Sequence, residues 1–137
     1  MSILAQVTWV EDRRFVGRAS SGHAIVVDAS AEKQGSSPME LLLIGMAGCT
    51  AYDVMSILEK KRQSVTGLEV SARAERAEEP PKVYTTIEVE YVLRGRGIKP
   101  KAVEDAIRLS EEKYCSASIM LGKTAQITTS YRIEEED

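Results

Sequence analysis

The two cysteines are the residues of this chain best suited to do chemistry, Cys49 within a long apolar stretch and Cys115 far along the sequence. A thiolate is a nucleophile that peroxides oxidise to a sulfenic acid, whereas a buried thiol packs as a small hydrophobe. In a reducing compartment two cysteines cannot be assumed to form a structural disulfide. Each cysteine can therefore be free, buried or redox-active. Small residues beside Cys49, such as Gly48 and Ala51, leave room for a ligand or a second backbone.

Other chemically capable residues are fewer. His23 is the only histidine, and its predicted place at a strand edge gives no reason to expect Cys–His catalysis. Asp53 comes one helical turn after Cys49, where an ionised carboxylate would disfavour a thiolate, so we expect Asp53 to pair with a basic residue or with solvent. Two distant cysteines and one histidine are too few ligands for a metal, and no glycine-rich nucleotide motif is present. Neither a metal nor a cofactor is expected.

The bulk properties are those of an ordinary globular protein. At 137 residues, with 43% hydrophobic and 28% charged residues, the chain fits one compact domain, which we predict to span 1–137. A net charge of -3 with scattered basic residues makes nucleic acid an unexpected partner. The first residues lack a basic segment followed by an apolar one, so we expect a cytoplasmic protein.

A long helix is predicted to begin at Ser37 and to end at the basic residues 60–62, with an apolar run from Leu41 to Leu58. Ser37 can cap the first free amides, Pro38 suits the first helical position, and Glu40 can close a capping box. Apolar residues then cover nearly every face, so this helix must be enclosed, and Asp53 within the stretch argues against a membrane span. Two glycines inside the helix weaken it by roughly 1 kcal/mol each, which we expect close packing to offset.

Alternating and β-branched runs predict strands on both sides of this helix. In the run from Val83 to Leu93 the apolar side chains share one face, which is typical of an antiparallel sheet with one wet face. A second, amphipathic helix has an apolar stripe that runs to Tyr114, just before Cys115. The predicted strands are 3–10, 14–16, 24–27, 68–74, 83–93 and 125–133, and the helices after the first are 101–114 and 116–121.

These elements describe an α+β domain in which antiparallel sheets wrap around a buried central helix. A central helix with no polar face cannot be covered fully inside so small a domain. We therefore predict an obligate, intertwined homodimer in which a second subunit completes the burial of the helix.

Two segments carry a resemblance to a known family. Residues 37–54, SPMELLLIGMAGCTAYDV, are similar to the central-helix motif of the OsmC/Ohr family, which comprises osmotically inducible protein C and the organic hydroperoxide resistance proteins. Residues 109–118, LSEEKYCSAS, are similar to the second cysteine motif of that family. The order and lengths of the predicted elements agree with the family over almost the whole chain.

The resemblance implies a role for both cysteines. In the family the first cysteine attacks the peroxide and the second resolves the sulfenic acid as an intramolecular disulfide, and these roles fall on Cys49 and Cys115. An apolar wall disfavours a thiolate, so an active enzyme needs a nearby cation. The family uses an early arginine, and the segment GRASSG at residues 17–22 resembles the one that carries it, so Arg18 is the candidate.

Glu40 is the candidate for the glutamate that orients this arginine in the family. In this chain Glu40 comes one position later after the proline than in the hydroperoxide-resistance branch, and a capping role alone would also explain it. Nine residues on a helix correspond to about 13.5 Å of rise and half a turn, so Glu40 cannot meet Cys49 within one straight helix. A shared pocket would need a mobile arginine or the helix of a partner subunit.

The resemblance implies a thiol peroxidase that reduces organic hydroperoxides, or hydrogen peroxide less well, in oxidative stress defence. Its reductant would be a dithiol, such as the lipoylated proteins that recycle relatives in the hydroperoxide-resistance branch. One alternative is a non-enzymatic dimer of the same fold that binds a hydrophobic small molecule or a partner protein, which the position of Glu40 and the presence of Asp53 favour. Another is a slow redox sensor that forms the disulfide between Cys49 and Cys115 as a signal.

Overall fold

The computed structural model describes residues 1–137, and the chain divides into two compact units, Met1–Leu43 and Ile44–Asp137. Each unit is described by itself. Strands and helices form where the sequence predicted them. In chain order the elements are β1 (Ala5–Glu11), β2 (Arg14–Ala19), β3 (Ala24–Asp28), α1 (Pro38–Lys60), β4 (Ser64–Arg76), β5 (Tyr84–Arg96), α2 (Pro100–Leu109), η1 (Ser110–Tyr114), α3 (Ser116–Leu121) and β6 (Gln126–Glu135).

The N-terminal unit is an antiparallel sheet in the order β1-β2-β3, as the alternating sequence predicted. Every residue of β1 is exposed, and so are large apolar side chains on both outer strands, including Trp9 and Ile25. A sheet normally buries one face against another layer. This unit therefore presents an apolar surface that its own residues do not cover.

The second sheet has the order β4-β5-β6. Strands β4 and β5 are antiparallel, but β5 and β6 are parallel, so the prediction of purely antiparallel sheets is wrong for this one pair. The reason is the connection: α2, η1 and α3 carry the chain back along the sheet before β6 begins, and such a crossover joins parallel strands.

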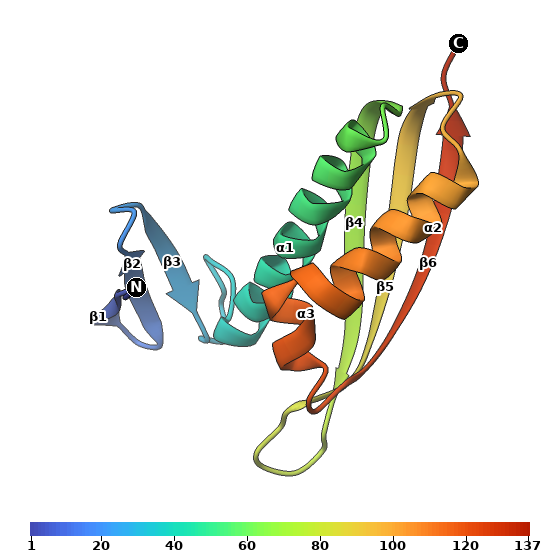
Figure 1. Cartoon of the computed structure of the whole chain (residues 1–137). Helices are drawn as coiled ribbons and strands as arrows, with labels where there is room; N and C mark the ends of the chain where they lie inside the picture. The colour runs from blue at the N-terminus through green and yellow to red at the C-terminus, as the bar shows by residue number, and fades with distance from the viewer. The chain divides into compact units, whose positions relative to one another are not determined.

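One face of this second sheet forms the core. The alternating residues Ile87, Val89, Tyr91 and Leu93 of β5 are buried, while Glu88 and its neighbours on the other face are exposed, as the period-two pattern predicted. In Figure 1 the helices of this unit lie on one face of the sheet. The same face holds the buried side chains of α2, so the core lies between the helices and the sheet.

Helix α1 begins at the predicted capping box. Only one stripe of the helix is buried, with four-residue spacing: Met46, Thr50, Val54 and Leu58. The prediction that α1 is enclosed on all sides is therefore not met within one chain. A Cβ added at either glycine of α1, Gly45 or Gly48, would meet no atom within 4 Å, so no close packing inside the chain explains them.

The predicted helix at 101–114 is interrupted. Helix α2 ends at Leu109, and Ser110–Tyr114 form a π-helical turn in which the backbone N–H of Cys115 donates to the carbonyl of Ser110 at 2.8 Å. The wider turn shifts the residues that follow relative to an α-helix. Tyr114 is consequently half exposed rather than part of the buried stripe, and Cys115 takes the inward position.

Helix α1 is also long and apolar enough, by length and composition alone, to cross a bilayer. Its most apolar window has a mean hydropathy of 1.7. Core helices of soluble proteins often have the same length and apolar composition.

Candidate active site

Cys49 lies on the regular part of α1, one residue before the buried Thr50. Its thiol is half-buried and free. Because Met46 and Thr50 on the same helix point into the core, Cys49 is held at the edge of the buried stripe, where it faces the segment that follows α2. A regular helix therefore fixes the first sulfur at the border between core and surface.

Cys115 lies at the junction of η1 and α3 and is completely buried. Its Sγ accepts hydrogen bonds from the backbone N–H of Ser118 at 3.3 Å and from the Ser118 hydroxyl at 3.0 Å. Its own S–H has a weak acceptor, the Met46 carbonyl, at 4.0 Å. Burial raises the pKa of the Cys115 thiol, the Ser118 hydroxyl opposes that rise, and the neighbouring Cys49 adds to it.

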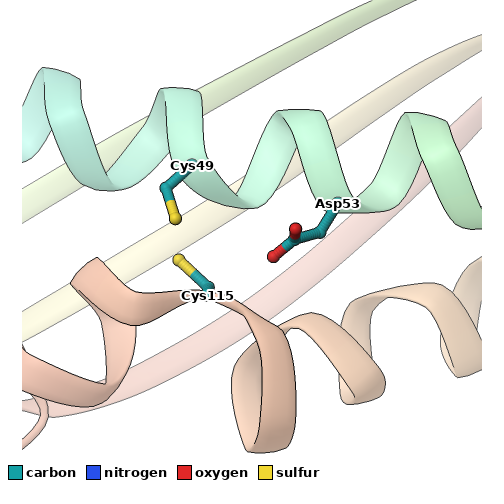
Figure 2. A group of neighbouring side chains, drawn as sticks. All are labelled: Cys49, Asp53 and Cys115. Carbon is teal, nitrogen blue, oxygen red and sulfur yellow. The ribbon is translucent and has the colours of Figure 1, made fainter. Parts of the chain in front are cut away.

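The two sulfurs and one carboxylate converge. The Sγ atoms of Cys49 and Cys115 and a carboxylate oxygen of Asp53 all lie within 4.8 Å of one another. Figure 2 shows the two sulfurs pointing toward each other, one from α1 and one from the start of α3, with the Asp53 carboxylate beside them. Both thiols are free.

Asp53 is held by a hydroxyl and not by a cation. Ser110 Oγ donates to Asp53 Oδ2 at 3.0 Å, and none of the ion pairs of the chain includes Asp53. Of the two partners expected for Asp53, a basic residue or solvent, the basic residue is therefore not found. Behind Ser110 the network continues, because Thr50 Oγ1 lies 2.8 Å from Ser110 Oγ and 2.8 Å from the Tyr91 hydroxyl.

This network is buried in the core. Thr50, Ser110 and Tyr91 are at most 1% exposed. Burial raises the pKa of Tyr91 to about 12, and the charges of nearby acidic groups, including Asp53, add to that rise. Tyr91 is therefore a neutral hydrogen-bond donor at physiological pH, and the chain of hydroxyls ends on a single carboxylate.

The sequence pointed to the thiols but not to the groups around them. Ser110 lies within the helix predicted at 101–114, yet nothing in the sequence linked it to Asp53 on α1. The four-residue spacing of Cys49 and Asp53 was the one available signal, since it places both on the same side of a helix.

The comparison with known proteins identifies the family. A family model described as OsmC-like protein matches residues 31–130. Protein YhfA of Escherichia coli strain K12 is 45% identical over 129 residues, which cover 94% of this chain and 96% of YhfA. The chain belongs to the OsmC-like family. The resemblance predicted from the two cysteine motifs is confirmed.

Solved structures share the fold of this chain. A hypothetical protein from Aquifex aeolicus VF5 superposes with a TM-score of 0.90 at 32% identity, covering 100% of this chain and 99% of that chain. An organic hydroperoxide resistance protein from Elizabethkingia anophelis superposes with a TM-score of 0.73 at 15% identity, covering 98% and 97%. At 15% identity the similarity to the Elizabethkingia anophelis protein shows a shared fold alone.

The other predicted site residues of this OsmC-like chain lie in the N-terminal unit. Arg18 is exposed on β2, paired in register with Gln6 and Ala24. Glu40 accepts a hydrogen bond from the backbone N–H of Ser37 at 2.8 Å, and this bond holds the pKa of Glu40 below its usual value. The reciprocal bond, from the Glu40 N–H to Ser37 Oγ at 3.2 Å, completes the capping box.

The same unit carries the lone histidine. His23 is exposed, with its Nδ1 3.3 Å from Ser21 Oγ.

Proposed function

We propose that this OsmC-like protein is a thiol peroxidase that reduces organic hydroperoxides, and hydrogen peroxide less well, with Cys49 as the attacking thiol and Cys115 as the resolving thiol. The observation that carries the proposal is the convergence of two free thiols from distant parts of the sequence within 4.8 Å. The half-buried Cys49 has access to a substrate, whereas the buried Cys115 can reach only its partner sulfur.

The chemistry has two steps. Cys49 sulfur attacks the terminal peroxide oxygen, the O–O bond breaks, and the alkoxide leaves as an alcohol after taking up a proton. Cys49 is then a sulfenic acid. Cys115 sulfur displaces the hydroxyl group from it, giving the disulfide and water. A dithiol reductant, such as the lipoyl arm of a lipoylated protein, restores both thiols by exchange, and no further cofactor is needed.

A thiolate at Cys49 requires a positive charge, because Asp53 already places a negative one beside the sulfurs. No ion pair brings a basic side chain to Asp53. We assign this role to Arg18 of the N-terminal unit. Glu40 has its hydrogen bonds within the capping box, so orientation of Arg18 by Glu40 is the weaker part of the proposal.

A homodimer with the sites at the subunit interface is part of the proposal. Helix α1 exposes Ile44 by 58% and Tyr52 by 74%, and the N-terminal sheet exposes Trp9 by 64%. Apolar surfaces of this extent are typical of subunit interfaces. Gly48 lies between Ile44 and Tyr52 at helical spacing, with free space where a Cβ would stand, so a second backbone could approach α1 there.

The dimer is tested by the mass of the protein in solution. Tyr52→Glu should dissociate the dimer, because it places a charge in the apolar contact. Met120→Glu is the matched control, since Met120 of α3 is 71% exposed without belonging to the proposed contact. A wild-type protein that is monomeric at micromolar concentration would exclude this part of the proposal.

The peroxidase reaction is tested with one equivalent of cumene hydroperoxide and the reduced protein. Free thiols should fall by two per chain, with the mass loss of one disulfide. Cys49→Ser should abolish thiol loss, and Cys115→Ser should stop at a sulfenic acid that a dimedone-type reagent captures. Unchanged thiols in the wild type would refute the function. Hydrogen peroxide at the same concentration measures the substrate preference, and fractionation of cells tests the expected cytoplasmic location.

A slow redox sensor is the second candidate, and Asp53 is the observation that favours it. A carboxylate without a cation partner opposes thiolate formation nearby, so the first oxidation would be slow. Repeated turnover with dihydrolipoamide separates the two functions. An enzyme consumes many equivalents of hydroperoxide, whereas a sensor stops at or near one.

A further inference from the structure

The hydrogen-bond chain behind Asp53 has a single possible direction when this carboxylate is ionised. Ser110 has one hydroxyl proton and gives it to Asp53. The 2.8 Å contact between Thr50 and Ser110 then requires Thr50 to donate, and the contact between Thr50 and Tyr91 requires Tyr91 to donate. Three buried hydroxyl groups are thus all oriented toward one carboxylate, which they hold in place beside the sulfurs.

Resolution of a sulfenic acid poses a proton problem at this site. Cys115 is completely buried, and burial raises the pKa of its thiol, so it carries its proton at neutral pH. Its hydrogen-bond acceptors are the Cys49 thiol and the Met46 carbonyl at 4.0 Å, and neither a thiol nor a carbonyl oxygen is basic enough to take the proton away. The two Ser118 donors stabilise negative charge on the sulfur but cannot accept a proton from it.

We propose that Asp53 is the proton carrier of the resolving step, a role that rests on the proposed peroxidase function. Its carboxylate oxygen lies within 4.8 Å of both sulfurs, beside the atom that must lose a proton and the atom whose hydroxyl group must gain one. The hydroxyl chain fixes this oxygen in position, so little reorganisation precedes the transfer.

The step balances without any further reactant. Cys115 sulfur attacks the sulfenic sulfur of Cys49, the S–S bond forms, and the S–O bond breaks. The Cys115 proton passes to Asp53, and Asp53 delivers it to the departing hydroxide, which leaves as water. The Cys115 sulfur is oxidised as the Cys49 sulfur is reduced to the same level, and Asp53 ends as the carboxylate from which it began.

The test is Asp53→Asn, because an asparagine Oδ1 still accepts the Ser110 hydroxyl but does not take up a proton at neutral pH. The reduced variant is oxidised with one equivalent of cumene hydroperoxide. Mass spectrometry follows sulfenic acid and disulfide with time. Disulfide formation should slow by about a hundredfold, the lower range for general acid–base catalysis, while the sulfenic acid accumulates.

Three further measurements separate proton transfer from structural support. The deficit of Asp53→Asn should shrink as the pH rises, because Cys115 then loses its proton to solvent hydroxide, whereas a misplaced sulfur would stay slow at every pH. Asp53→Glu should recover part of the rate. Glu112→Gln is the control, since it removes one negative charge at an exposed position three residues before Cys115 and should leave the step unchanged.

The outcomes distinguish this proposal from the function on which it rests. A wild type that forms neither sulfenic acid nor disulfide with the hydroperoxide removes both. A wild type that oxidises normally, together with an Asp53→Asn variant that closes its disulfide at the wild-type rate, overturns the role of Asp53 alone. A deficit that persists unchanged at high pH also overturns it.

Discussion

Asp28 in the N-terminal unit and Asp53 beside the thiols are two aspartates with opposite surroundings. Asp28 is completely buried and accepts hydrogen bonds from the backbone N–H groups of Ser30 and Gln34, from the Ser30 hydroxyl, and from Arg14 Nε at 3.1 Å. These donors, the Ser30 hydroxyl foremost, hold the pKa of Asp28 far below its usual value. Asp53 has one hydroxyl donor and no cation.

The difference separates a structural carboxylate from a reactive one. Asp28 has its acceptor capacity filled and closes the loop after β3, so it has no free lone pair to offer a substrate. Asp53 keeps acceptor capacity free and faces two sulfurs with it. The number of donors around a carboxylate, more than its burial, therefore indicates which of the two does chemistry.

The largest expected effect on stability comes from Asp28→Asn. An asparagine cannot accept from all four donors and leaves Arg14 without its carboxylate, so the midpoint of thermal unfolding should fall sharply. Asp53→Asn should leave that midpoint nearly unchanged. Differential scanning calorimetry at neutral pH makes the comparison, and equal losses in the two variants would contradict it.

The pH dependence of the same experiment has a definite sign. Because the pKa of Asp28 is lowered in the folded state, its contribution is fully present above the ordinary carboxyl pKa and is lost as the pH falls toward the folded value. The difference in unfolding midpoint between wild type and Asp28→Asn should therefore become smaller as the pH falls.

A smaller loss is expected for Ser110→Ala. The change removes the only donor to Asp53 and leaves the Thr50 hydroxyl without one partner in the core, which should cost roughly 1–3 kcal/mol of unfolding free energy. Disulfide closure should also slow, but less than in Asp53→Asn, because the carboxylate remains present though no longer fixed. Chemical denaturation and the peroxide assay report the two effects. If disulfide formation were slower in Ser110→Ala than in Asp53→Asn, the main role in the resolving step would belong to Ser110.

Ser118 offers a third, weaker test on the side of the resolving thiol. The Ser118 hydroxyl lowers the pKa of Cys115, so Ser118→Ala should raise that pKa further. In the Cys49→Ser background Cys115 is the only thiol, so the ultraviolet absorbance of its thiolate measures this pKa. With Ser118→Ala added, the midpoint of the thiolate titration should lie above that of an ordinary cysteine. Loss of one hydrogen bond of about 1 kcal/mol corresponds to roughly fivefold slower closure when Cys49 is present. An unchanged midpoint would show that Ser118 has no influence on the thiol.

The sequence predicted the regular elements because their signals are local. The capping box at Ser37 and the alternation along β5 depend on neighbouring residues, and both are present in the structure. The direction of β6 could not be predicted, since it depends on where the helical segment before it leads the chain. The π-helical turn could not be predicted either, because residues 101–114 have the periodicity of an uninterrupted helix.

The candidate site, like the fold, has features that the sequence predicted and features that it could not predict. The two cysteines were found from motifs, but the partner of Asp53 lies 57 positions further along the chain, and no local pattern joins them. The expectation of a basic partner followed from charge alone and neglected the hydroxyls of the core. Buried polar networks form from residues that meet only after folding, so their members are read from a structure rather than from spacing.

The smallest effect is expected for Glu40→Gln, which tests whether Glu40 belongs with Asp28 or with Asp53. A glutamine at the third helical position can still accept from the Ser37 N–H, so a purely capping role predicts a slight fall in the unfolding midpoint and unchanged peroxide reduction. Because the pKa of Glu40 is lowered, the small stabilisation that its carboxylate gives the folded state is present above the ordinary carboxyl pKa and is lost in acid. If Glu40 instead orients Arg18, then kcat/KM for cumene hydroperoxide should fall at least tenfold with no change in stability, and the same loss should follow Arg18→Gln. A loss of activity in Arg18→Gln alone would keep the arginine in the site and leave Glu40 as a helix cap.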